Sequence, residues 1–204
     1  MTVDDLLEGL QAQVKADCRV LVLGSMPGGM SLRQAQYYAH PRNRFWPLMA
    51  ALFGVDAQAP YAARMLSLQR AGVGLWDVIA RCRRRGSLDA AIVRGSEVLN
   101  PVGPLIAGLP ALRLVACNGA AAHRAFQRFI AASLPAGTGV AVLGLPSTSP
   151  ANAACSLQAL WQAWQPVAAA AIPDRHDAAA PSRGGPAAEA REHRAGQGSG
   201  PCAD

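Results

Sequence analysis

Short runs of consecutive apolar residues alternate along this chain with longer segments in which apolar residues recur every three or four positions. The first run, 19–24 (RVLVLG), is continuous and ends in glycine, which is typical of a strand buried on both faces of a parallel sheet. Three further runs, at 73–78, 112–119 and 139–145, also predict strands.

Helical periodicity fills most of the chain between these strands. Thr2 can cap a first helix, and Pro47 stands in the first turn of a segment that Gly54 ends. Ser149 and Pro150 suit the N-cap and the first position of a long final helix. The predicted helices are 2–14, 43–54, 61–72, 100–109 (capped by Asn100), 120–133 and 149–164.

This alternation predicts the fold class: a three-layer α/β/α protein with a central, mainly parallel, four-stranded sheet joined by right-handed crossovers. We predict three parts: an N-terminal helix in 1–17, an α/β domain in 18–172, and a disordered tail in 173–204. The tail is assigned on composition, because it is rich in Ala, Pro, Gly, Arg and Glu and has almost no large apolar residue.

The net charge of +6 is unevenly distributed. Residues 18–172 hold fourteen arginines and four acidic residues, a net charge of +10, whereas both ends of the chain are net acidic. A GC-rich coding sequence would explain arginine in place of lysine, but it would not explain the shortage of acidic residues. A basic body of this kind favours a polyanionic partner such as a nucleic acid.

The sequence predicts no membrane segment, no metal and no cofactor. No apolar run approaches the roughly 20 residues of a spanning helix, and the acidic N-terminus differs from a signal peptide, so we expect a soluble cytoplasmic protein. The five cysteines are scattered and include no C-x-x-C pair. This pattern favours reduced thiols and offers no ligand spacing for zinc or an iron-sulfur cluster.

Loops that follow the strands are the first place to look for chemistry, because parallel α/β proteins bind ligands at the carboxyl ends of their strands. Loop 24–29 (GSMPGG) is neither a Walker loop nor a dinucleotide fingerprint. Its glycines let backbone N–H groups approach a flat polar ligand, or they form a plain turn. In 145–152 (LPSTSPAN), three hydroxyl residues precede the predicted final helix, where they suit a phosphate or an N-cap.

Five motifs, in chain order, resemble the uracil-DNA glycosylase superfamily, and most closely its hypoxanthine-DNA glycosylase branch (family 6). They are GSMPG, YYAHPRNRFW, GVGLWDV, VACNG and LPSTSPAN, and the resemblance covers residues 19–164. It implies a monomeric, monofunctional DNA glycosylase of base excision repair. Such an enzyme flips a deaminated base out of double- or single-stranded DNA, and water then attacks C1′ and cleaves the N-glycosidic bond. Hypoxanthine is the implied base, with uracil and xanthine as further substrates.

The resemblance also implies which residue is catalytic. Many members carry Asp or Asn where this chain has Met26, and His where it has Leu145; the hypoxanthine branch resembles this chain in both absences. The implied catalytic residue is Asn43, which would orient the attacking water, since a dissociative transition state needs positioning more than a strong base. The alternative is that Asn43 only caps the helix that follows it.

The implied base pocket combines the first loop with residues at the ends of the other strands. Tyr38 would stack on the flipped base, or pack in the core under the loop. Asp77 would accept a hydrogen bond from a purine N–H, or cap a turn. The implied pocket residues are Gly24, Ser25, Met26, Pro27, Gly28, Tyr38, Asp77 and Asn118.

DNA phosphates would meet arginines and the hydroxyl loop. The alternative for the RCRRR run, 81–85, is a solvated charged face. The implied DNA-binding residues are Arg42, Arg44, Arg81, Arg83, Arg84, Arg85, Ser147, Thr148 and Ser149. Because the chain has a single lysine, Lys15, and strand-cleaving glycosylases use an amine for a Schiff base, we expect no lyase activity.

Two other functions are compatible with the residues. A non-catalytic nucleic-acid-binding module is supported by Met26 and Leu145, which remove two expected polar groups. An unrelated nucleotide-binding α/β enzyme is disfavoured, because no phosphate-loop fingerprint is present.

The composition of the tail gives a direct prediction. A chain that ends near Pro173 should keep the melting temperature and the activity of the full chain, because 173–204 lacks residues to bury. Thermal unfolding of both proteins, side by side, measures this. A large loss of melting temperature in the shortened chain would show that the tail is part of the fold.

Overall fold

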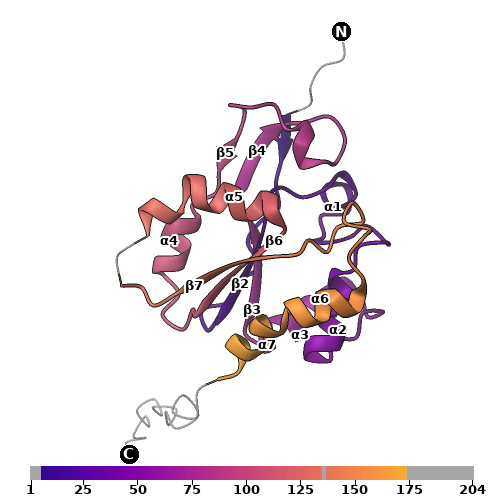
Figure 1. The fold of residues 1–204 in the computed structure, drawn as a ribbon, viewed down its shortest axis with the longest axis vertical. Coiled ribbons are helices and arrows are strands. Elements are labelled where there is room, and N and C mark those ends of the chain that lie inside the picture. Colours follow the sequence, from indigo (N-terminus) through magenta and orange to yellow (C-terminus); the bar gives the residue numbers. More distant parts are fainter. Residues whose placement is uncertain (1–5, 135–136, 174–204) are drawn as a thin grey trace, which may run out of the picture. The chain divides into compact units, whose positions relative to one another are not determined.

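A four-stranded parallel sheet forms the centre of the protein, whose computed structural model describes residues 6–134 and 137–173. The strand order is β3–β2–β6–β7 (Figure 1). The strands are β2 (Val20–Gly24), β3 (Val73–Asp77), β6 (Leu114–Asn118) and β7 (Ala141–Leu145). All four predicted strands and their parallel arrangement are confirmed.

Helices cover both faces of this sheet, so the predicted three-layer α/β/α fold is confirmed (Figure 1). One layer consists of α2 (Phe45–Phe53), α3 (Tyr61–Arg70), α6 (Leu157–Ala163) and α7 (Gln165–Ala171). The other consists of α4 (Val102–Ala107) and α5 (Ala120–Phe129). Shorter pieces are α1 (Gly29–Gln34) and the 3-10 helices η1 (Asp89–Ala91) and η2 (Ala131–Ser133).

The central strand β2 shows why its sequence is continuously apolar. Val20 and Val22 are buried in the core beneath α2 and α7, whereas Leu21 and Leu23 are buried in the core beneath α4 and α5. Successive side chains of a strand point to opposite faces, so a strand between two helical layers needs an apolar residue at every position. Phe45 and Trp46 are also buried and anchor the start of α2.

The predicted N-terminal helix is wrong for residues 6–17. Leu6–Glu8 form strand β1, which pairs antiparallel with β4. Gln13 forms an antiparallel bridge with Leu75, with N–H to carbonyl distances of 2.9 and 3.1 Å. Strand β3 lies at the edge of the main sheet, where the N–H and the carbonyl of Leu75 have no partner strand. Gln13 bonds to both of these groups, which a residue within a helix could not do.

A second, three-stranded antiparallel sheet was not predicted from the sequence. Its order is β1–β4–β5, with β4 at Ile79–Arg83 and β5 at Val98–Leu99. Strand β4 includes most of the RCRRR run, which lacks the apolar pattern of a strand. Its side chains alternate nevertheless: Cys82 is buried, whereas Arg81 and Arg83 are exposed.

The predicted final helix, 149–164, is also wrong at its start. Helix α6 begins at Leu157, and the Ser156 hydroxyl accepts a hydrogen bond from the Ala159 N–H at 3.1 Å. Ser149 therefore does not cap it. The loop before α6 is held by Arg44, whose guanidinium donates to the carbonyls of Ser149, Asn152 and Cys155.

The last described residues are tied to the sheet. Arg19 Nε donates to the Ala171 carbonyl at 2.6 Å, and Arg113 donates to the Ile172 carbonyl at 2.8 Å. The predicted tail lies outside the described residues, apart from Pro173. Within 6–134 and 137–173, no helix has the length and apolar character needed to cross a membrane.

Candidate active site

The carboxyl edge of the parallel sheet brings the strand-end motifs together. Strand pairing places Gly24 opposite Asp77, and Asn118 opposite Leu145. Because all four strands run in the same direction, the loops that follow them meet at one edge, as the sequence predicts.

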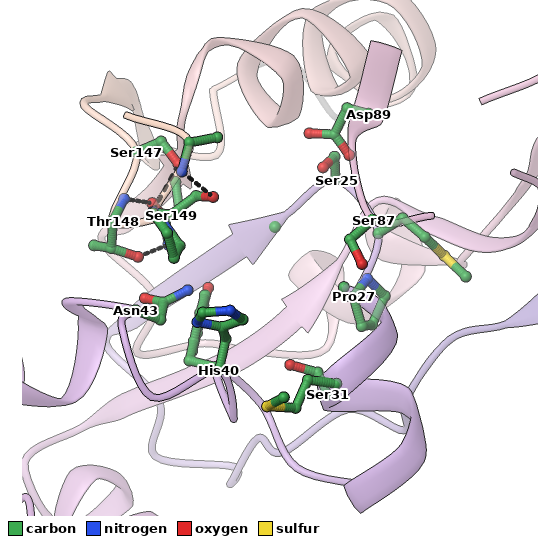
Figure 2. Close-up of a pocket in the computed structure, with 18 of the residues that line it drawn as sticks. Ser25, Pro27, Ser31, His40, Asn43, Ser87, Asp89, Ser147, Thr148 and Ser149 are labelled. Atoms are coloured by element: carbon green, nitrogen blue, oxygen red, sulfur yellow. Dashed lines mark hydrogen bonds between the residues drawn. The ribbon is translucent and has the colours of Figure 1, made fainter. Parts of the chain in front are cut away.

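A pocket of about 290 Å³ opens at this edge (Figure 2). Figure 2 shows Ser25, Pro27 and Ser87 on one side and Ser147–Ser149 on the other, with Asn43 and His40 below Ser147–Ser149. All eight predicted base-pocket residues line it, and so does Asn43. The other lining residues are Gly29, Met30, Ser31, Tyr37, His40, Ser87, Leu88, Asp89, Ser147, Thr148, Ser149, Pro150 and Ala151.

A tight turn of the HPRN segment sets the position of Asn43. The Asn43 N–H donates to the His40 carbonyl at 2.8 Å, and the His40 Nδ1 accepts from the Arg42 N–H at 3.1 Å. Asn43 Oδ1 accepts from the Phe45 N–H at 2.9 Å, which holds the start of α2. The Asn43 side chain therefore stabilises the start of α2 through its Oδ1. Its Nδ2 makes no hydrogen bond to other described residues.

Tyr38 lies between the core and the pocket. Its ring stacks on Phe45, with centroids 3.8 Å apart and planes 20° from parallel. Its φ of 56° lies in the left-handed region, which is uncommon for a residue with a bulky side chain. Tyr37, by contrast, is buried, and its hydroxyl donates towards the Leu10 and Gln11 carbonyls, both at 3.3 Å. Both tyrosines line the pocket, but Tyr37 is a buried core residue, whereas Tyr38 is only partly buried.

The Asn118 side chain clamps the last loop to the sheet. Its Nδ2 donates to Thr148 Oγ1 and its Oδ1 accepts from the Thr148 N–H, both at 2.9 Å. Thr148 is completely buried. Its predicted contact with a DNA phosphate is therefore wrong, because its hydroxyl is inaccessible and already bonded.

Asp77 is a buried carboxyl on the pocket wall. Its side chain is 4% exposed, and Oδ2 has no hydrogen-bond partner among the described residues. Burial raises the pKa of Asp77 from 3.8 to about 7; Asp89 adds to this shift, and the Tyr37 hydroxyl and Arg84 oppose it. The sequence interpretation of Asp77 as a carboxylate does not take account of this burial.

Two of the predicted DNA-binding arginines are instead internal to the fold. Arg84 is 2% exposed and donates through Nη2 to the Pro27 carbonyl, so its predicted phosphate contact is wrong. The cause is the alternation begun in β4, which turns residues 82 and 84 inward. The Arg44 guanidinium is committed to the carbonyls before α6, so it serves the loop and not a phosphate.

The other predicted phosphate contacts remain compatible with the structure. Arg42, Arg81, Arg83 and Arg85 are exposed, and Ser147 and Ser149 lie at the pocket wall. Sequence reasoning missed a whole lip of the pocket, Ser87–Asp89. This segment follows β4 in the second sheet, and it carries no glycine-rich or strand-end signal that would have indicated its position.

A parallel α/β sheet with a polar pocket at its carboxyl edge is typical of the class of α/β proteins that bind a ligand there. Known proteins narrow this class. Residues 12–168 match the family model of the uracil DNA glycosylase superfamily. The chain belongs to the uracil DNA glycosylase superfamily, and it is a DNA glycosylase, as its strand-end motifs predict.

Two proteins named hypoxanthine DNA glycosylase are similar to this chain. The one from Methanosarcina barkeri is 38% identical over 113 residues, which span 55% of this chain and 70% of the relative. The one from Methanosarcina acetivorans is 34% identical over 145 residues, or 71% and 87% of the two chains. The solution NMR structure of a candidate uracil DNA glycosylase from Methanosarcina acetivorans superposes with a TM-score of 0.67. It is 30% identical, over 80% of this chain and 97% of the other.

Burial of Asp77 predicts a pH-dependent stability. Between pH 4 and about 7 the native carboxyl keeps a proton that the unfolded chain releases, so the native state loses stability as the pH rises. Asp77→Asn removes this titration. The unfolding free energy of Asp77→Asn, relative to that of the parent, should rise by up to about 1.4 kcal/mol per pH unit between pH 4 and about 7. At higher pH the difference should stay constant.

Denaturant unfolding of both proteins from pH 4 to 8.5 measures the difference. Asp56→Asn is the matched control, because Asp56 is an exposed carboxylate of the same domain whose Oδ1 accepts from the Gln58 N–H. A constant gap between Asp77→Asn and the parent across this range would contradict a raised pKa for Asp77.

Proposed function

We propose that this protein excises hypoxanthine from DNA that contains deoxyinosine. The observation that supports this most directly is the convergence, on one base-sized pocket, of every pocket residue that the hypoxanthine-glycosylase resemblance implies. The two relatives named hypoxanthine DNA glycosylase support the choice of base. Uracil and xanthine, which carry an oxygen where cytosine and guanine carry an amine, are proposed as further substrates.

The target base would enter the pocket by flipping out of its stack. Flipping costs a few kcal/mol, and a pocket offsets this cost by stacking and by hydrogen bonds to the base edge. The outer face of the Tyr38 ring, backed by Phe45, is suited to stack on the flipped base. Loop 24–29 lines the same pocket, and its backbone N–H groups are proposed to donate to the base.

Exposed arginines would hold the DNA backbone beside this pocket. Arg42 is exposed within the HPRN turn. Strand β4 and the residues just after it add three more exposed arginines, Arg81, Arg83 and Arg85. The shortage of acidic residues in 18–172 gives these side chains few competitors for phosphate. A monomer acting on double- or single-stranded DNA is part of the proposal.

Asn43 is the proposed catalytic residue. Water must approach C1′ as the glycosidic bond breaks, and the transition state resembles an oxocarbenium ion. Met26, in the first loop, is buried against Ile79 and Cys82 and has no group that can hold water. Asn43 lines the pocket and has both a donor Nδ2 and a spare acceptor lone pair on Oδ1.

A non-catalytic DNA-binding module is the second candidate, and apolar Met26 and Leu145 are the observation that favours it. Leu145 is buried in the core beneath α2 and α7 and contributes no polar group. An excision assay separates the two functions, because a module would bind damaged DNA and leave it intact.

A duplex with one deoxyinosine should release free hypoxanthine and keep an unbroken strand that nicks only after alkali. Lys15, the single lysine of the chain, is exposed and is not among the pocket residues, so no lysine is placed to form a Schiff base. Strand analysis before and after alkali, with borohydride trapping, measures both points. A trapped covalent adduct would overturn the monofunctional proposal, and an intact base would favour the binding module.

The two roles of Asn43 can be separated by substitution. Asn43→Ala removes both the hydrogen bond to the Phe45 N–H and the amide, so it should lower stability by about 1 kcal/mol and reduce excision on the order of a hundredfold. Asn43→Ser keeps an oxygen that can accept from Phe45, so it should recover stability but not activity.

Single-turnover excision and thermal unfolding of both variants measure these effects. Normal excision by Asn43→Ser would show that the amide is only a cap and that the water is held elsewhere.

A further inference from the structure

The proposed function leaves open which group recognises the chemical change that deamination makes in a base. Deamination of adenine replaces an amino group, which donates hydrogen bonds, with an oxygen, which accepts them. The pocket must therefore present a donor at that position. Met26 offers none, and Asn118 holds Thr148 with its Oδ1 and with one of the two N–H groups of its Nδ2.

We propose that Asp77 works as a neutral carboxylic acid and donates a hydrogen bond to the oxygen that deamination leaves on the base. This inference rests on the proposed function, and it reverses the sequence interpretation of Asp77 as an acceptor. It makes Asp77 a residue that determines specificity and binds the leaving base.

The geometry holds the Asp77 carboxyl in the pocket wall. The Asn100 Nδ2 donates to the Asp77 carbonyl at 2.9 Å, and the next N–H, of Val78, donates to the Gly24 carbonyl at 3.0 Å. A Cβ at position 24 would lie 2.2 Å from Asp77 Oδ1, so glycine opposite Asp77 is what makes room for the carboxyl. The carboxyl borders the pocket and has Oδ2 without a partner.

The groups around the carboxyl favour its neutral form. A buried carboxylate needs a paired cation or several donors, and a carboxyl without them keeps its proton. The neighbouring cation, Arg84, donates to the Pro27 carbonyl, and its Nε and Nη1 have no hydrogen-bond partner among the described residues. Burial raises the pKa of Asp77, and Asp89 raises it further. The Tyr37 hydroxyl and Arg84 lower this pKa, but burial outweighs them. Tyr38 also faces the carboxyl.

A neutral acid suits both recognition and leaving-group departure. An ionised carboxylate only accepts hydrogen bonds, so it would repel the oxygen of hypoxanthine and attract the amino group of undamaged adenine. During excision the C1′–N9 bond breaks with its electron pair going to the base, and the water oxygen bonds to C1′. The proton lost by the water balances the one that the base gains. Negative charge that develops on the base oxygen strengthens the bond from Asp77, which keeps its own proton.

The test is single-turnover release of hypoxanthine from a deoxyinosine duplex between pH 5.5 and 9, with the full chain. The parent rate should fall about tenfold per pH unit once Asp77 ionises. Asp77→Asn donates through its NH₂ group at every pH, so it should stay within about tenfold of the parent at pH 6 and show a flat profile. Asp77→Leu has the volume but no donor and should lose at least a hundredfold.

Asp89→Asn, at the other carboxyl among the pocket residues, is the comparison variant; it should keep the decline but shift it to lower pH, because Asp89 adds to the raised pKa of Asp77. His40 also lines the pocket, so the profile of Asp77→Asn decides which of the two side chains causes the decline. A decline that persists in Asp77→Asn, or a flat parent profile, would overturn the role of Asp77. A folded Asp77→Asn protein without activity would overturn it as well.

The same experiment separates this inference from the proposed function. If the parent releases no hypoxanthine at any pH, the proposed function itself fails. If the parent is active but the profiles of parent and Asp77→Asn coincide, only the role of Asp77 fails.

Discussion

The parallel pairing of β2 with β3 on one side and β6 on the other is the constraint on which the rest of this structure depends. It aligns the carboxyl ends of the strands, so that Gly24 stands beside Asp77 and Asn118 follows one strand further on. Each strand then releases its loop at the same edge, and the pocket is the space that these loops enclose. Parallel pairing also buries β2 on both faces, which accounts for the apolar sequence before the first loop.

Side chains that bond to backbone hold these loops, since the loops lack regular structure of their own. Arg44 satisfies three carbonyls before α6, Arg84 satisfies the Pro27 carbonyl, and Asn118 satisfies the backbone and hydroxyl of Thr148. Buried backbone groups must find partners, and a loop that borders a ligand pocket cannot find them in a helix or sheet. Residues that looked like ligands for DNA in the sequence thus prove to shape the pocket.

This distinction sets the limit of what the sequence could predict. Apolar runs located the four parallel strands, and their shared direction located the pocket. The signal is plainest for the three strands that end in Gly24, Asp77 and Asn118, because they are buried on both faces. The segment 6–17 was predicted as a helix from its periodicity, but the need of β3 for an edge partner prevailed. The local sequence of this segment does not indicate the pairing, because the unpaired edge of β3 exists only once the sheet has formed.

The arginine run shows the same limit at the level of single residues. Five positions, 81–85, read as one basic patch, but pairing of β4 with β1 and β5 makes Cys82 and then Arg84 point inward. The lip at 87–89 was missed for a related reason, because its place beside the pocket depends on that second sheet. Net charge could therefore indicate a polyanionic partner, but it could not assign individual arginines to it.

Some of the residues that line the resulting pocket serve the fold itself. Asn118 is bonded to Thr148, Thr148 is buried, and Met26 and Leu145 are apolar, so the other polar side chains of the pocket carry the selectivity. Burial has a direct electrostatic consequence: a carboxyl enclosed in the wall without a paired cation is more stable with its proton than without it. In the proposed role, burial thus converts Asp77 from an acceptor into a donor. The two apolar residues that seemed to argue against catalysis are therefore compatible with a pocket that recognises an oxygen on a base and not an amine.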